Sequence, residues 1–320
     1  MKVLVTGAAG FIGSHMAERM ALSGFDVIGV DNLSNYYARE LKLANVKCLN
    51  SKGIDFIEAD LRYTADYESF STDFDYIFHF AAQPGLSETS SFQDYLSNNV
   101  VATNELMNFS RQCNSLQMFV NISTSSVYGL DATLDENAAP SPVSWYGVTK
   151  LAAEQLVMAE SRKEILQACS LRLYSVYGPR ERPDKLYPKL IRAALCDETF
   201  TLVEGSLQHK RSFSFVDDII DGVASVIGRE KTANNQVFNI GTDVQHTTAE
   251  GIAVVERLTA KKIQMELIAA RQGNQTNTKA VIDKAKKMLN YNPKTSLEEG
   301  IQKQINWFKE NVSVFTDETS

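Results

Sequence analysis

The chain has 320 residues, about twice the length of a typical domain of roughly 150 residues, which predicts one large α/β domain or two closely joined ones and excludes a long solenoid or a mini-protein. A hydrophobic content of 44% and a charged content of 22% are ordinary for a globular chain and exclude disorder. With 32 Lys and Arg against 39 Asp and Glu, the net charge of -7 argues against nucleic acid as a partner.

The cysteines and the amino terminus indicate where the protein works. The cysteines fit neither a CxxC metal site nor a disulfide framework in a chain of this size, because they lie far apart, at Cys48, Cys113, Cys169 and Cys196. The amino terminus has one basic residue and an apolar run too short for a signal sequence, and no later apolar stretch reaches about 18 residues. We therefore expect a cytoplasmic protein without a membrane span.

Strands and helices alternate along the first half of the chain. Residues 3–5 form a short apolar run, residues 11–20 have apolar side chains at helical spacing, and residues 25–30 form a second apolar run. Further strands are predicted at 54–57, 74–80, 118–122 and 169–173, and helices at 95–111, 144–162 and 216–227. This order predicts an α/β fold with a doubly wound parallel sheet.

The pattern becomes less regular after about residue 175. Helices are predicted near 187–195, 249–258 and 297–311, among loops and short strands. No linker rich in proline or serine separates this part from the first, so we expect a smaller carboxy-terminal lobe packed closely against the sheet, with the active cleft between them.

Three glycines mark the turn after the first strand. Gly7, Gly10 and Gly13 are spaced three apart between a strand and a helix, where glycine lets backbone N–H groups approach a pyrophosphate. A merely structural turn is the alternative. Asp31 ends the second strand about 20 residues later, as a dinucleotide site requires. Its carboxylate would bind the adenosine ribose and repel a 2′-phosphate, which favours NAD over NADP.

A second cofactor contact is expected after the third strand. Asp60 and Leu61 are placed to meet the adenine, although an aspartate at a strand end also serves as a helix cap. The complete set of candidate cofactor-binding residues is Gly7, Gly10, Phe11, Ile12, Gly13, Asp31, Asn32, Asp60, Leu61, Ala81, Ala82, Asn99, Tyr146 and Lys150.

Tyr146 and Lys150 are the candidate catalytic pair. They lie four apart on one helix face, so the ammonium, together with a nicotinamide, is expected to lower the pKa of the phenol and make it a base for a substrate hydroxyl. An exposed helical tyrosine and lysine would be the simpler explanation. The hydroxyls of residues 123–126 favour the catalytic interpretation, because they follow a strand at the edge where open α/β sheets bind ligands. Ordinary turn chemistry is the alternative for this cluster.

Several motifs together resemble the extended short-chain dehydrogenase/reductase family. They are TGAAGFIG, Asp31, HFAAQ at 79–83, STSSVYG, YGVTK and LRLYSVYGP, and they span nearly the whole chain. The resemblance implies a Rossmann-type NAD-binding domain over 1–174, rejoined by 211–242, and a nucleotide-sugar-binding lobe over 175–320. It adds Thr124 to Tyr146 and Lys150 as the third catalytic residue. It also implies a homodimer paired through helices 95–111 and 144–162.

The carboxy-terminal half is similar to the nucleotide-sugar branch of that family, through RSFSFVDDI at 211–219, FNIG at 238–241 and the segment 284–301. Within the branch, residues 31–42 and 178–184 are similar to UDP-glucuronate 4-epimerases. Related decarboxylases and dehydratases carry a glutamate where this chain has Ser126, and UDP-galactose 4-epimerases differ at Ser125, Ser126 and Ser175.

Hydroxyl groups suit a uronate for a chemical reason. Oxidation of a uronic acid at C4 gives a β-keto acid, which loses carbon dioxide when its carboxylate stands perpendicular to the carbonyl plane. Neutral donors can hold that carboxylate in an unproductive orientation, whereas a glutamate would repel it. The expected substrate-binding residues are Thr124, Ser125, Ser126, Tyr146, Ser175, Arg182, Arg211 and Arg271, the last two resembling the family's diphosphate and ribose contacts.

Two departures and two alternatives accompany this interpretation. Related epimerases read Gly-Val-Arg where this chain has residues 85–87, and Gly-Asp where it has 273–274. A UDP-glucuronate decarboxylase, or a 4-epimerase of UDP-glucose or another nucleotide sugar, is the alternative within enzymes. A protein that senses NAD(H) is the alternative outside them, although it has no need of Thr124, Tyr146 and Lys150. The four histidines lack metal-ligand spacing, so no metal is expected.

Overall fold

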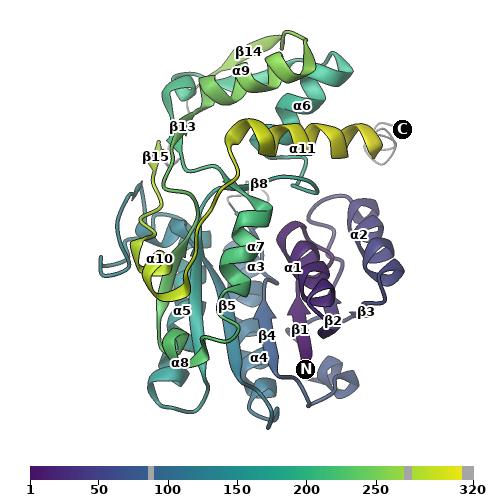
Figure 1. The fold of residues 1–320 in the computed structure, drawn as a ribbon, viewed down its shortest axis with the longest axis vertical. Helices are drawn as coiled ribbons and strands as arrows, with labels where there is room; N and C mark the ends of the chain where they lie inside the picture. Colours follow the sequence, from purple (N-terminus) through teal and green to yellow (C-terminus); the bar gives the residue numbers. More distant parts are fainter. Residues whose placement is uncertain (86–89, 270–275, 312–320) are drawn as a thin grey trace.

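The computed structural model describes residues 1–85, 90–269 and 276–311. Its centre is a parallel sheet of seven strands in the order β12-β7-β5-β4-β1-β2-β3. The strands in that order are β12 (Val237–Ile240), β7 (Ala168–Leu173), β5 (Met118–Thr124), β4 (Tyr76–His79), β1 (Lys2–Thr6), β2 (Asp26–Asp31) and β3 (Asp55–Glu58). This is the predicted Rossmann-type doubly wound α/β fold (Figure 1).

Helices cover both faces of the sheet because its strands are apolar on both sides. Val3 and Val5 of β1 point towards one face and pack in the same core as Met16, whereas Leu4 points to the other and packs with Leu106. The first face carries α1 (Phe11–Leu22), α2 (Arg39–Ser51), α7 (Val216–Ala224) and α10 (Asp283–Leu289). The second carries α3 (Phe92–Leu96), the π-helical turn η2 (Ser97–Val101), α4 (Ala102–Ser110) and α5 (Trp145–Arg162).

The smaller lobe lies beyond the carboxyl ends of the strands (Figure 1). Its helices are α6 (Leu186–Cys196), α9 (Thr248–Thr259) and α11 (Leu297–Glu310). Its short strands pair as β9 (Phe200–Val203) with β14 (Met265–Ile268), β8 (Val176–Tyr177) with β11 (Ser214–Phe215), and β13 (His246–Thr247), β10 (Lys210–Arg211), β15 (Asn277–Thr278) and β6 (Asp131–Ala132) in one small sheet. The remaining short helices are η1 (Thr64–Ser69), η3 (Ser125–Tyr128), η4 (Ser206–Gln208) and α8 (Glu230–Ala233).

Several elements differ from the sequence-based expectation, and two of these differences concern residues at or behind the site. The helix predicted over 95–111 is interrupted by the π-helical turn η2. The side chain of the buried Asn99 in this turn accepts a hydrogen bond from the backbone N–H of Gln83 and donates one to the Thr149 hydroxyl. Helix α2 has no predicted counterpart because its buried face is partly polar: Lys42 donates to Ser34, and Asn45 donates to the Ala9 carbonyl at 2.8 Å. Apolar periodicity does not reveal a helix of that kind.

Candidate active site

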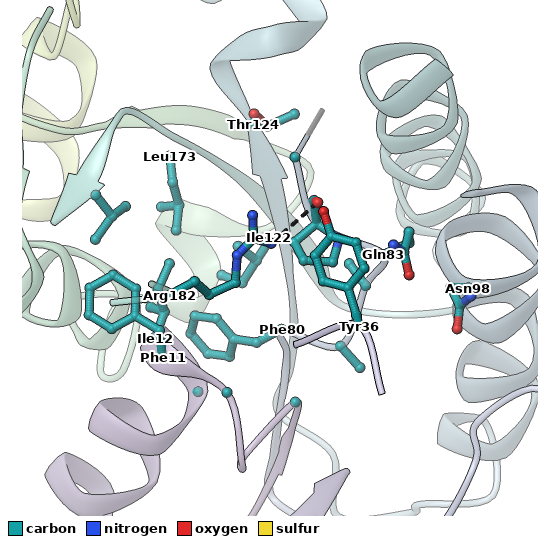
Figure 2. A pocket seen from close by; sticks show the side chains of 18 of the residues that line it. Phe11, Ile12, Tyr36, Phe80, Gln83, Asn98, Ile122, Thr124, Leu173 and Arg182 are labelled. Atoms are coloured by element: carbon teal, nitrogen blue, oxygen red, sulfur yellow. Dashed lines mark hydrogen bonds between the residues drawn. The ribbon is translucent and has the colours of Figure 1, made fainter. Parts of the chain in front are cut away.

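A cavity of about 580 Å³ opens above the carboxyl ends of the central strands and is bounded on the other side by the smaller lobe (Figure 2). Parallel sheets bind ligands at this edge, and the volume is that of a typical ligand site. Most predicted site residues line it: Gly7, Gly10, Phe11, Ile12, Gly13, Asp31, Asn32, Asp60, Leu61, Ala81, Ala82, Thr124, Tyr146, Lys150, Ser175, Arg182 and Arg211.

The glycine turn leaves a cradle that side chains would fill. Gly7 has a φ of +70°, and a Cβ there would approach the backbone nitrogen of Ala81 to 2.8 Å. A Cβ on Gly13 would lie 2.1 Å from the Gly7 carbonyl oxygen. A Cβ on Gly10 would meet only that oxygen, at 3.1 Å, so packing demands glycine less strongly there. The turn therefore leaves the amino end of α1 open to a phosphate group.

Two carboxylates stand at the far end of the cavity. Asp31 accepts a hydrogen bond from the backbone N–H of Leu33 at 2.8 Å, and burial raises its pKa against the opposing charge of Lys42. Burial also acts to raise the pKa of Asp60, but hydrogen bonds from Arg62 and Asn32 outweigh it and lower that pKa. Asp60 is thus held as an anion, and Asp31 sits where a ribose would find an acceptor.

Helix α5 positions the catalytic pair. The Ser144 hydroxyl caps the helix by accepting from the backbone N–H of Gly147 at 3.1 Å. Glycine at 147 lets the helix start close to the hydroxyl cluster, since a Cβ there would lie 2.7 Å from the Ser126 carbonyl oxygen. Tyr146 hydrogen-bonds Thr124 at the end of β5, and Lys150 follows one turn later, so the three predicted catalytic residues share one wall of the cavity.

The electrostatics of Tyr146 differ from the prediction. Burial raises the pKa of the phenol, and the influences that lower it include the Thr124 hydrogen bond, the positive charge of Arg182 and a backbone hydrogen bond from Gly85. Burial also lowers the pKa of Lys150 to about 8, against the charge of Glu154. In the protein itself, desolvation of the phenol therefore outweighs the influences that lower its pKa.

The predicted substrate hydroxyls divide into two groups. Thr124 and Ser175 line the cavity, and Ser175 has a φ of +24°, an unusual conformation of the kind found at functional sites. Ser125 and Ser126 lie behind them and do not line it. Ser126 instead accepts from Thr124 at 3.3 Å and donates its backbone N–H back to that hydroxyl at 3.2 Å.

Arg182 reaches into the cavity but is already partnered. Its guanidinium donates twice to Asp184, each at 2.9 Å, and once to the Pro84 carbonyl at 3.3 Å, while stacking on the ring of Tyr36 (Figure 2). Arg211 lines the same cavity, and burial lowers its pKa. Arg271 lies outside the described residues, as do Ser87 and Asn274 of the two departing segments.

Some residues depart from the predicted set. Asn98 lines the cavity, whereas Asn99 is buried behind it between Gln83 and Thr149; its role as a cofactor ligand remains a prediction. The lining residues that sequence reasoning missed include Tyr36, Tyr37, Lys42, Glu181 and Lys185. The tyrosines belong to the segment 31–42 that carried the resemblance, which was the available signal for them.

Other features bear on the chemistry. His79 is fully buried between the hydroxyls of Thr6 and Thr103, and burial lowers its pKa to about 3, so it is a neutral packing residue. Among the described residues, no three His, Cys, Asp or Glu side chains gather as metal ligands would. Across the same part of the chain, every helix is too short or too polar to cross a bilayer.

Comparisons with known proteins place this architecture in a family. The uncharacterized UDP-glucose epimerase YtcB of Bacillus subtilis is 37% identical over 95% of this chain and 97% of its own length. UDP-glucuronate 4-epimerase 3 of Arabidopsis thaliana is 30% identical over 96% of this chain and 76% of its own length. The crystal structure of a variant of the Bacillus cereus UDP-glucuronic acid 4-epimerase, in complex with UDP-4-deoxy-4-fluoro-glucuronic acid and NAD, is 34% identical and covers 97% of this chain and 99% of its own, with a TM-score of 0.91. Residues 3–241 match the NAD dependent epimerase/dehydratase family, and the chain belongs to that family.

Proposed function

We propose that the protein is an NAD-dependent epimerase that interconverts UDP-glucuronate and UDP-galacturonate at C4. The observation that carries this proposal is the convergence of Thr124, Tyr146 and Lys150 on a cavity that runs from a dinucleotide cradle to a rim of hydroxyls and arginines. The similarity to two epimerases whose names specify glucuronate supports the choice of sugar.

The residues present fit NAD. The space left by Gly7 and Gly13 suits a pyrophosphate at the amino end of α1, Asp31 offers an acceptor to the adenosine ribose, and Asp60 and Leu61 border the adenine position. Lys150 would meet the ribose of the nicotinamide half. When bound, NAD supplies a hydride acceptor that returns the hydride within the same turnover.

The protein's own residues transfer one proton and hold the diphosphate of the substrate in place. Tyr146, as a phenolate, takes the proton of the sugar 4-hydroxyl as C4 is oxidised, and Thr124 hydrogen-bonds the same oxygen. Arg211, with Arg271 as the predicted second contact, anchors the diphosphate while the 4-keto sugar turns over. Tyr146 then returns the proton to the O4 oxygen, and C4 is inverted because the turned sugar would receive the hydride on its opposite face.

The wall of the cavity suits a uronate. Ser175 can donate a hydrogen bond to a carboxylate, and Ser126 accepts from Thr124 and so fixes the hydroxyl cluster at the end of β5. Asp184 and the Pro84 carbonyl already accept hydrogen bonds from Arg182, so its guanidinium has fewer donors to offer a substrate carboxylate. Neutral donors therefore orient the carboxylate, and they can hold it away from the perpendicular geometry that favours loss of carbon dioxide.

The test is incubation with UDP-glucuronate, followed by separation of the nucleotide sugars. UDP-galacturonate is expected, without added oxidant. A UDP-pentose would instead identify a decarboxylase. The relative from Bacillus subtilis is named for UDP-glucose, which makes 4-epimerisation of UDP-glucose the second candidate, and a parallel incubation with UDP-glucose distinguishes the two. Binding of NAD(H) without turnover of any sugar would favour a sensor.

The same proposal includes a homodimer. The outer faces of α3, η2 and α5 expose apolar side chains, and the rings of Phe92 and Trp145 contact each other across α3 and α5 with centroids 6.0 Å apart. Val101 and Val148 extend this exposed surface. Apolar surface of this kind suits a second copy that adds two helices to these two and forms a four-helix bundle.

A further inference from the structure

A buried carboxyl group in the wall of the active cavity has no role in the proposed chemistry. Glu181 lies in the segment between β8 and α6 and is only 8% exposed. Its Oε2 accepts a hydrogen bond at 2.9 Å from the side-chain amide of Gln304, which is 2% exposed on α11. An ionised carboxylate at such a depth is costly unless a cation neutralises it.

The close packing of α11 fixes this pair in place. Gly300 lies one turn before Gln304 on the same helix face, and a Cβ on Gly300 would lie 2.1 Å from the Tyr177 hydroxyl. Only glycine therefore lets α11 approach the segment that carries Glu181.

The amide of Gln304 is half satisfied. Its Nε2 donates to Glu181, but its Oε1 is buried and has no hydrogen-bond partner among the described residues. A protonated carboxyl complements a primary amide, because the acid accepts one hydrogen bond and donates another. A carboxylate has no proton to donate and would leave this buried acceptor unsatisfied.

We propose that Glu181 is a neutral acid paired with the Gln304 amide, and that this pair is a positioning device that holds Arg182 against the wall of the active cavity. The proposal rests on the epimerase function proposed above. Arg182 follows Glu181 directly and reaches Pro84 and Tyr36 on the sheet side of the cleft. The positive charge of Arg182 lowers the pKa of Tyr146, so a displacement of this segment would change the electrostatic environment of the catalytic phenol.

The surroundings support the neutral form. Burial raises the pKa of Glu181 to about 8, and the Gln304 hydrogen bond opposes that rise only in part. The titratable and charged groups around it are Arg182, Asp184 and Lys185 of its own segment, Tyr177 of β8 and Tyr187 of α6. Of the cations among these, Arg182 and Lys185 both bind Asp184 instead.

The sign of the pH dependence follows from the raised pKa. The stability that the neutral acid contributes is fully present below the ordinary carboxyl value of 4.5 and is lost as the pH rises through about 8. Glu181→Gln keeps a neutral group that can both donate to and accept from Gln304, so the variant has no such loss. Its melting temperature relative to the wild type is therefore expected to rise between pH 5 and 9.

The decisive experiment compares the wild type, Glu181→Gln and Gln304→Met, with Gln302→Met as the matched control, because Gln302 lies on the same helix and bonds only Asn306 on the surface. With UDP-glucuronate, the ratio of Glu181→Gln to wild-type kcat is expected to grow above pH 8. We expect Gln304→Met to lower kcat about tenfold through misplacement of Arg182, and Gln302→Met to change it little.

An infrared measurement tests the protonation state without turnover. The wild type at pH 6 is expected to show a protonated carboxyl band that Glu181→Gln lacks and that fades above pH 8. Parallel pH profiles of kcat and melting temperature for the wild type and Glu181→Gln, or the absence of this band, would overturn the proposal. If the wild type turned over no sugar, the proposed function would fail, while the melting and infrared results would still decide the state of Glu181.

Discussion

At the scale of single residues, burial disfavours the charged forms of Tyr146 and Lys150. Burial raises the pKa of Tyr146 and lowers that of Lys150, so each resists the ionised state in the protein itself. Thr124 and Arg182 partly offset this effect on the phenol. Proton removal by Tyr146 therefore depends on partners contributed by both lobes.

Tyr146→Phe is expected to lower kcat for UDP-glucuronate by at least about 10³-fold, because it removes the phenol that takes the proton. Binding of the sugar nucleotide, measured by calorimetry, should change little. Tyr95→Phe is the control, since the Tyr95 ring lies 6.3 Å from that of Tyr146 but its hydroxyl donates to the Gly85 carbonyl. Substantial activity in Tyr146→Phe would exclude this residue as the base.

Asp31→Ala is expected to weaken NAD binding about tenfold and to reduce the preference over NADP, because the variant loses both an acceptor for the ribose and a charge that repels a 2′-phosphate. Glu58→Ala removes a carboxylate at the paired position of β3, where it bonds Arg39, and serves as the control. Dissociation constants for both cofactors provide the measurement. Unchanged affinity for both in Asp31→Ala would refute the assignment.

At the scale of elements, α5 is tied to the sheet by a buried ion pair. Arg172 of β7 donates to both carboxylate oxygens of Glu154 at 2.6 and 3.0 Å, and to the Tyr128 hydroxyl at 2.8 Å. Tyr128 in turn donates to Asn239 of β12. Because Glu154 lies one turn beyond Lys150, this network fixes the helix that carries the catalytic pair.

Glu154→Gln is expected to lower the free energy of unfolding by about 3 to 5 kcal/mol, because it leaves the Arg172 charge buried without its counter-ion. The double variant Glu154→Leu with Arg172→Met should recover most of that loss. Chemical denaturation of both variants measures the effect. A single variant as stable as the wild type would mean that the pair contributes nothing to the placement of α5.

Some elements and contacts of the site could be predicted from the sequence, and others could not. The strands around β1 and the glycine turn were predictable because local periodicity and spacing encode them. Tyr146 and Lys150 were singled out by their spacing on one helix, whereas Thr124 was added by the family resemblance. The partners of Arg182 were not predictable, since Tyr36 and Pro84 approach it only through tertiary folding. The π-helical turn at Asn99 likewise depends on contacts with Gln83 and Thr149 from other segments.

At the scale of the whole molecule, the exposed apolar surface on α3, η2 and α5 is the feature that a lone chain leaves unexplained. Val148→Asp is expected to convert a dimer into a monomer in sedimentation velocity, because it buries a charge in the proposed bundle. Ile165→Asp is the matched control, since Ile165 is 52% exposed against 44% for Val148 but lies beyond the end of α5. A wild-type monomer, or a Val148→Asp dimer, would contradict the proposed pairing.

The path of the chain limits how the sheet and the smaller lobe can move relative to each other. The chain passes between the sheet and the smaller lobe after β7, before α7, after β12, before α10 and before α11. A clamshell motion would have to bend all of these connections together, so no single hinge is available. We therefore expect the room that a hexuronyl ring needs for its half-turn to be built into the resting enzyme, with walls that stay in place while the sugar moves.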